Sequence, residues 1–228
     1  MISTSKLQAL TRQIGQFDAA LANFQTKYNQ IPGDTTLMGV VTGDNNGIVN
    51  HSGGCGGYGR EMAKYWSDLS NSGLLSSAGA AYIDNSNTNS DISVSTATKF
   101  PVALAGANAY VMVFGTSAGV NYYYITYAIS GNPGAQVQIG SSFKPSEALA
   151  FDQKLDDGLA NNGNVVGINH AGGFPAANGC PDATKTWVAP VSGNTCATSA
   201  GGNIYKVATA TNTCSIAVRL GISTGDLK

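Results

Sequence analysis

The sequence predicts an α+β protein in which one long N-terminal helix packs on an antiparallel β-sheet. Three observations predict this class: an apolar stripe of helical period near the start, short β-branched and aromatic runs in the second half, and Gly/Asn-rich turns between them. The 228 residues fit one domain. We divide it into an N-terminal helix over residues 1–31, a loop and helix insertion over 32–100, and a sheet with a cysteine-containing C-terminal region over 101–228.

The N-terminal helix is predicted by apolar residues that recur at steps of three and four. On a helix they form one stripe roughly 40 Å long, at 1.5 Å per residue. Ile31-Pro32-Gly33 is expected to end the helix, because the residue before proline is disfavoured in the helical conformation. A coiled-coil seam would need charged flanking pairs, so we expect the stripe to lie on a sheet. The helix packing stripe consists of Leu7, Leu10, Ile14, Phe17, Leu21, Phe24 and Tyr28.

Two shorter helices and five strands are expected after it. One helix carries Met62, Tyr65, Trp66 and Leu69 on a single face. Another is opened by Lys144-Pro145-Ser146-Glu147 and stopped by Asp156-Asp157-Gly158. The apolar and aromatic runs expected to form strands are Ile92–Thr98, Tyr110–Phe114, Tyr122–Ile129, Ile204–Ala208 and Ser215–Leu220.

The charge and the cysteine content limit which functions and which cellular compartments are compatible with the sequence. Twelve Lys and Arg against thirteen Asp and Glu leave no basic block of the kind expected for a nucleic-acid binder. Four cysteines without metal-ligand spacing favour two disulfides, in any of three pairings, over free thiols. No export signal or apolar run of spanning length accompanies them. We therefore expect the natural chain to begin upstream of Met1.

One stretch predicts a calcium site. Asp44-Asn45-Asn46-Gly47-Ile48 places oxygen-bearing side chains at alternate positions before a glycine and a free carbonyl, as in half of a calcium loop. A complete EF-hand loop needs a glutamate where this chain has Cys55, so we expect Glu61 to fold back instead. The predicted ligands are the side chains of Asp44, Asn46 and Glu61 and the carbonyl of Ile48. No other cofactor is suggested, and the alternative is an Asn-Gly turn.

Other motifs favour structural interpretations. Gly115-Thr116-Ser117-Ala118-Gly119 matches the Gly-x-Ser-x-Gly elbow of serine hydrolases, and Asp157 and His170 follow it. The motif lies between two expected strands, so we predict a hairpin turn, no catalytic residue and no enzyme; a serine esterase is the alternative. Gly54-x-Gly56-x-x-Gly59 lacks the βαβ context of a dinucleotide site. The carboxylates of Asp152, Asp156 and Asp157 are expected to shape a turn rather than hold a metal.

Four stretches, in chain order, carry a family resemblance. Phe24-Gln25-Thr26-Lys27-Tyr28-Asn29-Gln30-Ile31-Pro32-Gly33-Asp34 resembles the F-x-x-K-Y-x-x-[LI]-P-G-D exit of the first helix in type IV pilins and type II secretion pseudopilins. Gly59-Arg60-Glu61 with Tyr65-Trp66-x-x-Leu69, and Pro145-Ser146-Glu147-Ala148 with 152–158 and Gly163-Asn164-Val165, are similar to two further boxes of one pilin-like subgroup. Cys196, Tyr205 and Cys214 resemble its closing cysteine pair.

The resemblance implies a filament subunit rather than a catalyst. It implies a pilin-like head whose missing apolar half-helix anchors it in the inner membrane before assembly, and a final location on the cell surface. Its partners would be copies of itself and other pilin-like subunits, in adhesion, motility, DNA uptake or secretion. It also implies a Cys196–Cys214 disulfide, which would leave Cys55 for Cys180. The alternative is a secreted carbohydrate- or surface-binding module, which Gly/Asn/Tyr-rich loops would also suit.

Overall fold

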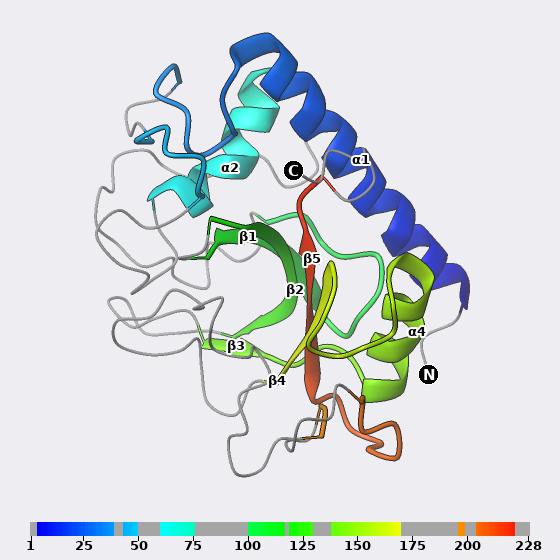
Figure 1. Cartoon of the computed structure of the whole chain (residues 1–228). Helices are drawn as coiled ribbons and strands as arrows, with labels where there is room; N and C mark the ends of the chain where they lie inside the picture. Colours follow the sequence, from blue (N-terminus) through cyan, green and yellow to red (C-terminus); the bar gives the residue numbers. More distant parts are fainter. Residues whose placement is uncertain are drawn as a thin grey trace.

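The computed structural model describes residues 4–38, 43–49, 60–75, 100–116, 119–129, 138–169, 196–198 and 204–221. These residues form an α+β fold, as predicted, with a long N-terminal helix followed by an antiparallel sheet and further helices (Figure 1). The elements in chain order are α1 (Thr4–Tyr28), α2 (Arg60–Asn71), β1 (Ala109–Gly115), β2 (Asn121–Ile129), β3 (Gln138–Gly140), α4 (Pro145–Leu155), β4 (Val165–Asn169) and β5 (Cys214–Arg219).

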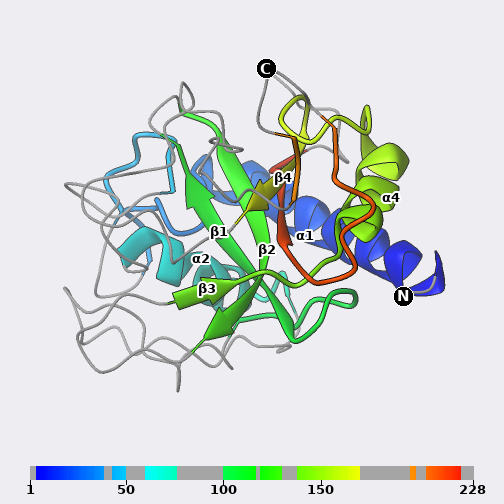
Figure 2. The same cartoon turned by 90° about the horizontal axis from the view of Figure 1, so that it is seen from below.

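The sheet follows the order β1-β2-β5-β4, and the short β3 pairs with the end of β2 (Figure 2). All pairings are antiparallel. Facing residues in an antiparallel pair lie on the same side of the sheet, so the register defines its two faces. One face is built from a set of fully buried apolar side chains: Val111, Val113, Tyr123, Ile125, Val165, Ile216 and Val218.

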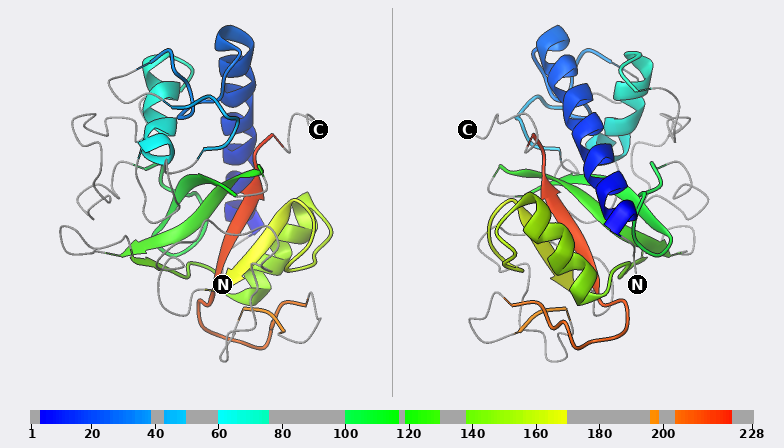
Figure 3. Two further views of the ribbon diagram at one scale, coloured as in Figure 1. Left: turned by 60° about the vertical axis from the view of Figure 1, so that its left-hand side comes forward. Right: turned by 90° about the vertical axis from the view of Figure 1, so that its right-hand side faces the viewer.

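Helix α1 lies along this apolar face. Its stripe from Leu7 to Phe24 is buried, and Tyr28 in the last turn is half-buried. The Phe17 ring lies 4.7 Å from the Trp66 ring of α2 and 5.9 Å from the Tyr123 ring of β2. Figure 3 shows α4 beside the N-terminal half of α1, and the two helices are in contact. The predicted packing of the N-terminal helix on a sheet is therefore confirmed.

The end of α1 differs from the prediction by one turn. Asn29 adopts a left-handed conformation with a φ of 53°, and its N–H donates to the Gln25 carbonyl at 2.7 Å. Asparagine tolerates this conformation better than most residues, so it ends the helix after Tyr28, before Pro32 can act. No helix in the described part of the chain is long and apolar enough to cross a membrane.

The strand predictions have mixed outcomes. The runs over 110–114, 122–129 and 215–220 match β1, β2 and β5, and Ile92–Thr98 lies outside the described residues. The prediction of a strand over Ile204–Ala208 is wrong: only Tyr205 pairs there, in an isolated bridge with Ala197. Tyr205 is buried whereas the nearby Ile204 and Val207 are exposed. The segment lies inside the loop closed by the Cys196–Cys214 disulfide and not in the sheet.

Candidate functional site

The segment that follows α1 is hydrogen-bonded to a buried ion pair within α2. The Gly33 N–H donates to Asp68 Oδ2 at 2.7 Å, and the same oxygen lies 3.1 Å from Lys64 Nζ. Lys64 also donates to the Thr35 carbonyl at 3.3 Å. Burial raises the pKa of Asp68, and the Lys64 charge only partly offsets this. Because both charges are buried and satisfied, removing either partner would leave the other uncompensated.

Gly33 is required at this crossing by its backbone. Its φ is 85°, a region that residues with a side chain rarely adopt. A Cβ atom at this position would also overlap the Glu61 carbonyl oxygen. The Pro-Gly-Asp stretch therefore has a physical explanation, since proline follows the helix end, glycine allows contact with α2, and Asp34 can turn toward the next loop.

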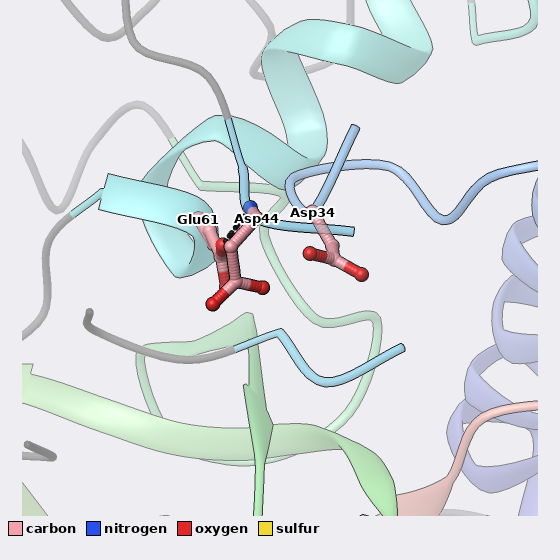
Figure 4. A group of neighbouring side chains, drawn as sticks. All are labelled: Asp34, Asp44 and Glu61. Atoms are coloured by element: carbon pink, nitrogen blue, oxygen red, sulfur yellow. Dashed lines mark hydrogen bonds between the residues drawn. The ribbon is translucent and has the colours of Figure 1, made fainter. Parts of the chain in front are cut away.

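Asp34, Asp44 and Glu61 form an acidic site at this crossing (Figure 4). One carboxylate oxygen from each lies within 4.8 Å of those from the other two. Asp34 follows α1, Asp44 belongs to the loop over 43–49, and Glu61 lies in the first turn of α2. Asp34 and Glu61 are buried, whereas Asp44 is exposed. The acidic site thus joins three segments that are separate in the sequence.

Two of these carboxylates bind the backbone of the 43–49 loop. Asp34 accepts hydrogen bonds from the N–H groups of Asn46 at 3.2 Å and Gly47 at 2.7 Å. Glu61 Oε1 accepts one from the Asp44 N–H at 3.0 Å. Burial raises the pKa of Asp34 despite these donors, which act in the opposite direction. The geometry therefore fastens the loop to α1 and α2.

The predicted calcium ligands are only partly brought together. Asp44 and Glu61 meet, and they are joined by Asp34, which the sequence reasoning missed. In the sequence, Asp34 could have been recognised as the acidic residue that ends the Pro32-Gly33-Asp34 stretch. The Asn46 side chain turns to its own loop, donating to Asp44 Oδ2 at 2.9 Å and accepting from the Ile48 N–H at 2.7 Å. Carboxylate oxygens are ligands that Ca²⁺ prefers, and calcium binding here stays a prediction.

A second carboxylate group, Asp152, Asp156 and Asp157, shapes the connection from α4 to β4. Asp156 accepts from the N–H groups of Asn164 and Val165, and Asp157 accepts from that of Leu159 at 2.8 Å. The expected turn is therefore confirmed, with the carboxylates serving as acceptors for backbone amides. Burial raises the pKa of Asp152 to about 6, and the two neighbouring carboxylates add to this effect.

Asp152 also anchors the disulfide-closed loop. The Tyr205 hydroxyl donates to Asp152 Oδ2 at 2.8 Å, and Tyr205 lies between Cys196 and Cys214, which form the expected disulfide. Gly167 of β4 leaves room for the Tyr205 ring, since a Cβ there would lie 2.5 Å from it. Cys55 and Cys180 lie outside the described residues.

The described residues of the Gly-x-Ser-x-Gly stretch lie at the end of an antiparallel hairpin, as predicted. Gly115 ends β1 opposite Asn121, the first residue of β2, and the Thr116 N–H donates to the Val120 carbonyl at 2.8 Å. The elbow of a serine hydrolase instead requires a strand followed by a helix. Ser117 and His170 lie outside the described residues, as do His51 and the 54–59 glycine motif.

A cavity of about 240 Å³ lies between α1, this hairpin turn and the end of β5. Its wall includes Asp18, which is fully buried and accepts from the Gly221 N–H at 2.9 Å. Asn121, also in the wall, accepts from the Val49 N–H and donates to the Gly47 carbonyl. These polar groups serve to connect neighbouring segments.

Comparison with known proteins adds no relative: no family model, no curated protein and no solved structure matches the chain.

Proposed function

We propose that this chain is the head of a structural subunit of a type IV pilus or pseudopilus filament. The observation that carries the proposal is the seating of α1, a 25-residue helix buried along one stripe on an antiparallel sheet. This is the arrangement that the resemblance implies for a pilin head. In such a subunit the helix connects the head to the filament, so it must be held firmly along its length.

Polar contacts from Gln13 and Asp18 to the residues flanking the sheet hold α1 in addition to its apolar stripe. The Gln13 side chain donates to the Val102 carbonyl at 2.8 Å and accepts from the Leu104 N–H at 3.0 Å. Asp18 binds the Gly221 N–H after β5. Val102 and Leu104 precede β1, and Gly221 follows β5. Because α1 is bound to the chain before the first strand and after the last one, a force applied along α1 would be distributed over the sheet.

The stretches that carry the resemblance also contact one another in pairs. Gly33 and Asp34 of the first stretch meet Glu61 and α2 of the second. Asp152 of the third meets Tyr205 inside the cysteine pair of the fourth. Because the stretches that resemble the family also contact one another in the folded chain, they support a resemblance in fold rather than in unconnected short motifs.

The proposed partners are further copies of this chain and other pilin-like subunits. We place the subunit in the inner membrane before assembly, through an apolar segment preceding α1, and on the cell surface afterwards. The Cys196–Cys214 disulfide fits the oxidising compartment that this route crosses.

The test is to read the natural gene upstream of Ile2 and to follow the tagged full-length product in its own cell. We expect a short basic leader, an apolar stretch leading directly into α1, and the tag in filaments sheared from the surface. A conventional cleaved signal peptide and a secreted monomer would contradict the proposal and would favour the carbohydrate- or surface-binding module.

A further inference from the structure

Asn-Gly occurs at Asn46-Gly47, Asn162-Gly163 and Asn178-Gly179, the last of which lies outside the described residues. In this dipeptide the glycine backbone nitrogen can attack the asparagine side-chain carbonyl carbon. A new carbon–nitrogen bond closes a five-membered imide, the bond to the side-chain nitrogen breaks, and ammonia leaves with the glycine amide proton. Water then opens the imide to aspartate or isoaspartate. The reaction therefore requires a glycine nitrogen and a side chain that can approach each other.

The two described dipeptides are closely matched. Both asparagines are exposed, and both glycines have positive φ, 86° at Gly47 and 78° at Gly163. Asn46-Gly47 lies in the loop that Asp34 binds, and Asn162-Gly163 lies in the turn that Asp156 and Asp157 bind. Differences in their reactivity should therefore come from the hydrogen bonds of the glycine nitrogen and the asparagine side chain.

At Asn46 both reacting groups are held. The Gly47 N–H donates to the buried carboxylate of Asp34 at 2.7 Å. The Asn46 amide is bound at both ends, donating to Asp44 and accepting from the Ile48 N–H. A hydrogen bond to a charged group must break before the Gly47 nitrogen can attack, so the folded protein should resist the reaction here.

At Asn162 the glycine nitrogen is not held, and the asparagine side chain is held at one end only. The Gly163 N–H donates to no residue of the described chain. The Asn162 side chain makes one hydrogen bond, from Nδ2 to Asp157 Oδ2 at 3.1 Å, which leaves its carbonyl oxygen unbound among the described residues. The turn is exposed at both residues, so water can reach the imide.

We propose that Asn162 is a site of spontaneous deamidation, and that the Asp34 carboxylate protects the matched Asn46. The product places a new carboxylate where Nδ2 now donates to Asp157, beside Asp152 and Asp156. An attractive contact becomes a repulsion between like charges, so the α4–β4 turn should loosen as the protein ages. The modification is independent of the proposed filament function.

The test follows the masses of peptides from folded protein incubated at mildly alkaline pH. We expect Asn162 to convert at least about tenfold faster than Asn46, the factor expected if one charge-assisted hydrogen bond must break first. Asn162 and Asn178 lie between the same two lysines, Lys154 and Lys185, so tandem fragmentation must assign the change. Asn162→Gln, which cannot close the five-membered ring, should remove the signal at this position.

The same incubation in concentrated urea supplies the control, because both dipeptides then lose their surroundings. Their rates should converge within a few fold under these conditions, by relief of the protection at Asn46. Equal rates in the folded protein, or faster conversion of Asn46, would overturn the proposal. Asn162→Asp should melt at a lower temperature than Asn162→Gln; equal melting temperatures would overturn the predicted effect on the turn.

Discussion

Replacing Phe17 with alanine tests whether α1 is clamped to the sheet. Phe17 is 5% exposed, and its ring packs edge-on against Trp66 at 4.7 Å and beside Tyr123 at 5.9 Å. A buried Phe→Ala change costs about 3–5 kcal/mol, because apolar contact is lost and a cavity remains. The expected cost is ~4 kcal/mol, of which the edge-to-face aromatic pair with Trp66 accounts for ~0.5–1.5 kcal/mol. This is a large fraction of the ~5–15 kcal/mol by which domains are stable.

The assay is urea unfolding with the disulfides intact, followed by far-UV circular dichroism and Trp fluorescence. An unchanged dependence of the unfolding free energy on urea concentration would show that the change acts on stability rather than on the compactness of either state. Phe17→Leu keeps most of the apolar volume and should cost less than ~1.5 kcal/mol. In a double-mutant cycle with Trp66→Ala, the two losses should be less than additive, because they remove the same contact.

Gln16→Ala is the matched control, since Gln16 is the exposed neighbour on the same helix turn. Its effect should stay within about 0.5 kcal/mol. If Phe17→Ala cost no more than this control, α1 would not be held by its apolar stripe. The argument that the helix connects a rigid head to a filament would then fail with it.

Three further predictions concern other joints of the fold. Gly33→Ala should cost ~2 kcal/mol or more in urea unfolding, because φ is positive and the Cβ meets the Glu61 carbonyl; Gly73→Ala, with similar φ and open space, should cost only ~1 kcal/mol. Asp152 has its pKa raised from 3.8 to about 6, so its contribution to stability is full below pH ~4 and is lost as pH rises through about 6, up to ~3 kcal/mol. Between pH 4 and 7 the unfolding free energy should depend less on pH in Asp152→Asn than in the unsubstituted protein, and equal pH dependence in the two proteins would refute this. Calcium should raise the melting temperature of the natural sequence but not of Asp44→Asn; no shift at millimolar calcium would reject the site.

The long helix could be predicted because its signal is local. A stripe at steps of three and four needs only neighbouring residues to be recognised, and Leu7, Ile14 and Phe24 are buried as expected. The end of the helix was less predictable, because Asn29 and Pro32 both act as stop signals. The structure uses the first of them, since Asn29 bonds back to Gln25 before the proline is reached.

The C-terminal half was less predictable because its strands depend on distant partners. β4 was missed, and Gly167, which interrupts its apolar run, is the residue that makes room for Tyr205. The strand expected around Tyr205 does not form, because the hydroxyl of this residue reaches Asp152 and the loop is closed by a disulfide. A short segment with alternating apolar residues has the same sequence pattern whether it is a strand or a loop that buries a single side chain.

The buried aspartates that join distant segments follow one physical rule, which no local sequence pattern reveals. Among the residues that the structure describes, four fully or almost fully buried aspartates each accept a hydrogen bond from the N–H of a glycine, over separations of 203, 13, 35 and 6 residues. All four glycines have positive φ. The pairs are Asp18 with Gly221, Asp34 with Gly47, Asp68 with Gly33, and Asp152 with Gly158.

The aspartate–glycine pairs also explain part of the composition, namely its many glycines and few charged residues. Glycine and the few charged residues suggested exposed turns, yet in these pairs a carboxylate leaves water because a backbone amide can satisfy it. Glycine suits the role because it adopts positive φ without strain and brings its N–H close to the acid. Each joint therefore depends on two residues at once: removing the acid leaves an amide without its acceptor, and adding a side chain to the glycine strains the backbone. Because one pair spans almost the whole chain and two others join separate elements, the joints hold the α1 exit, the 43–49 loop and the end of β5 in one rigid head.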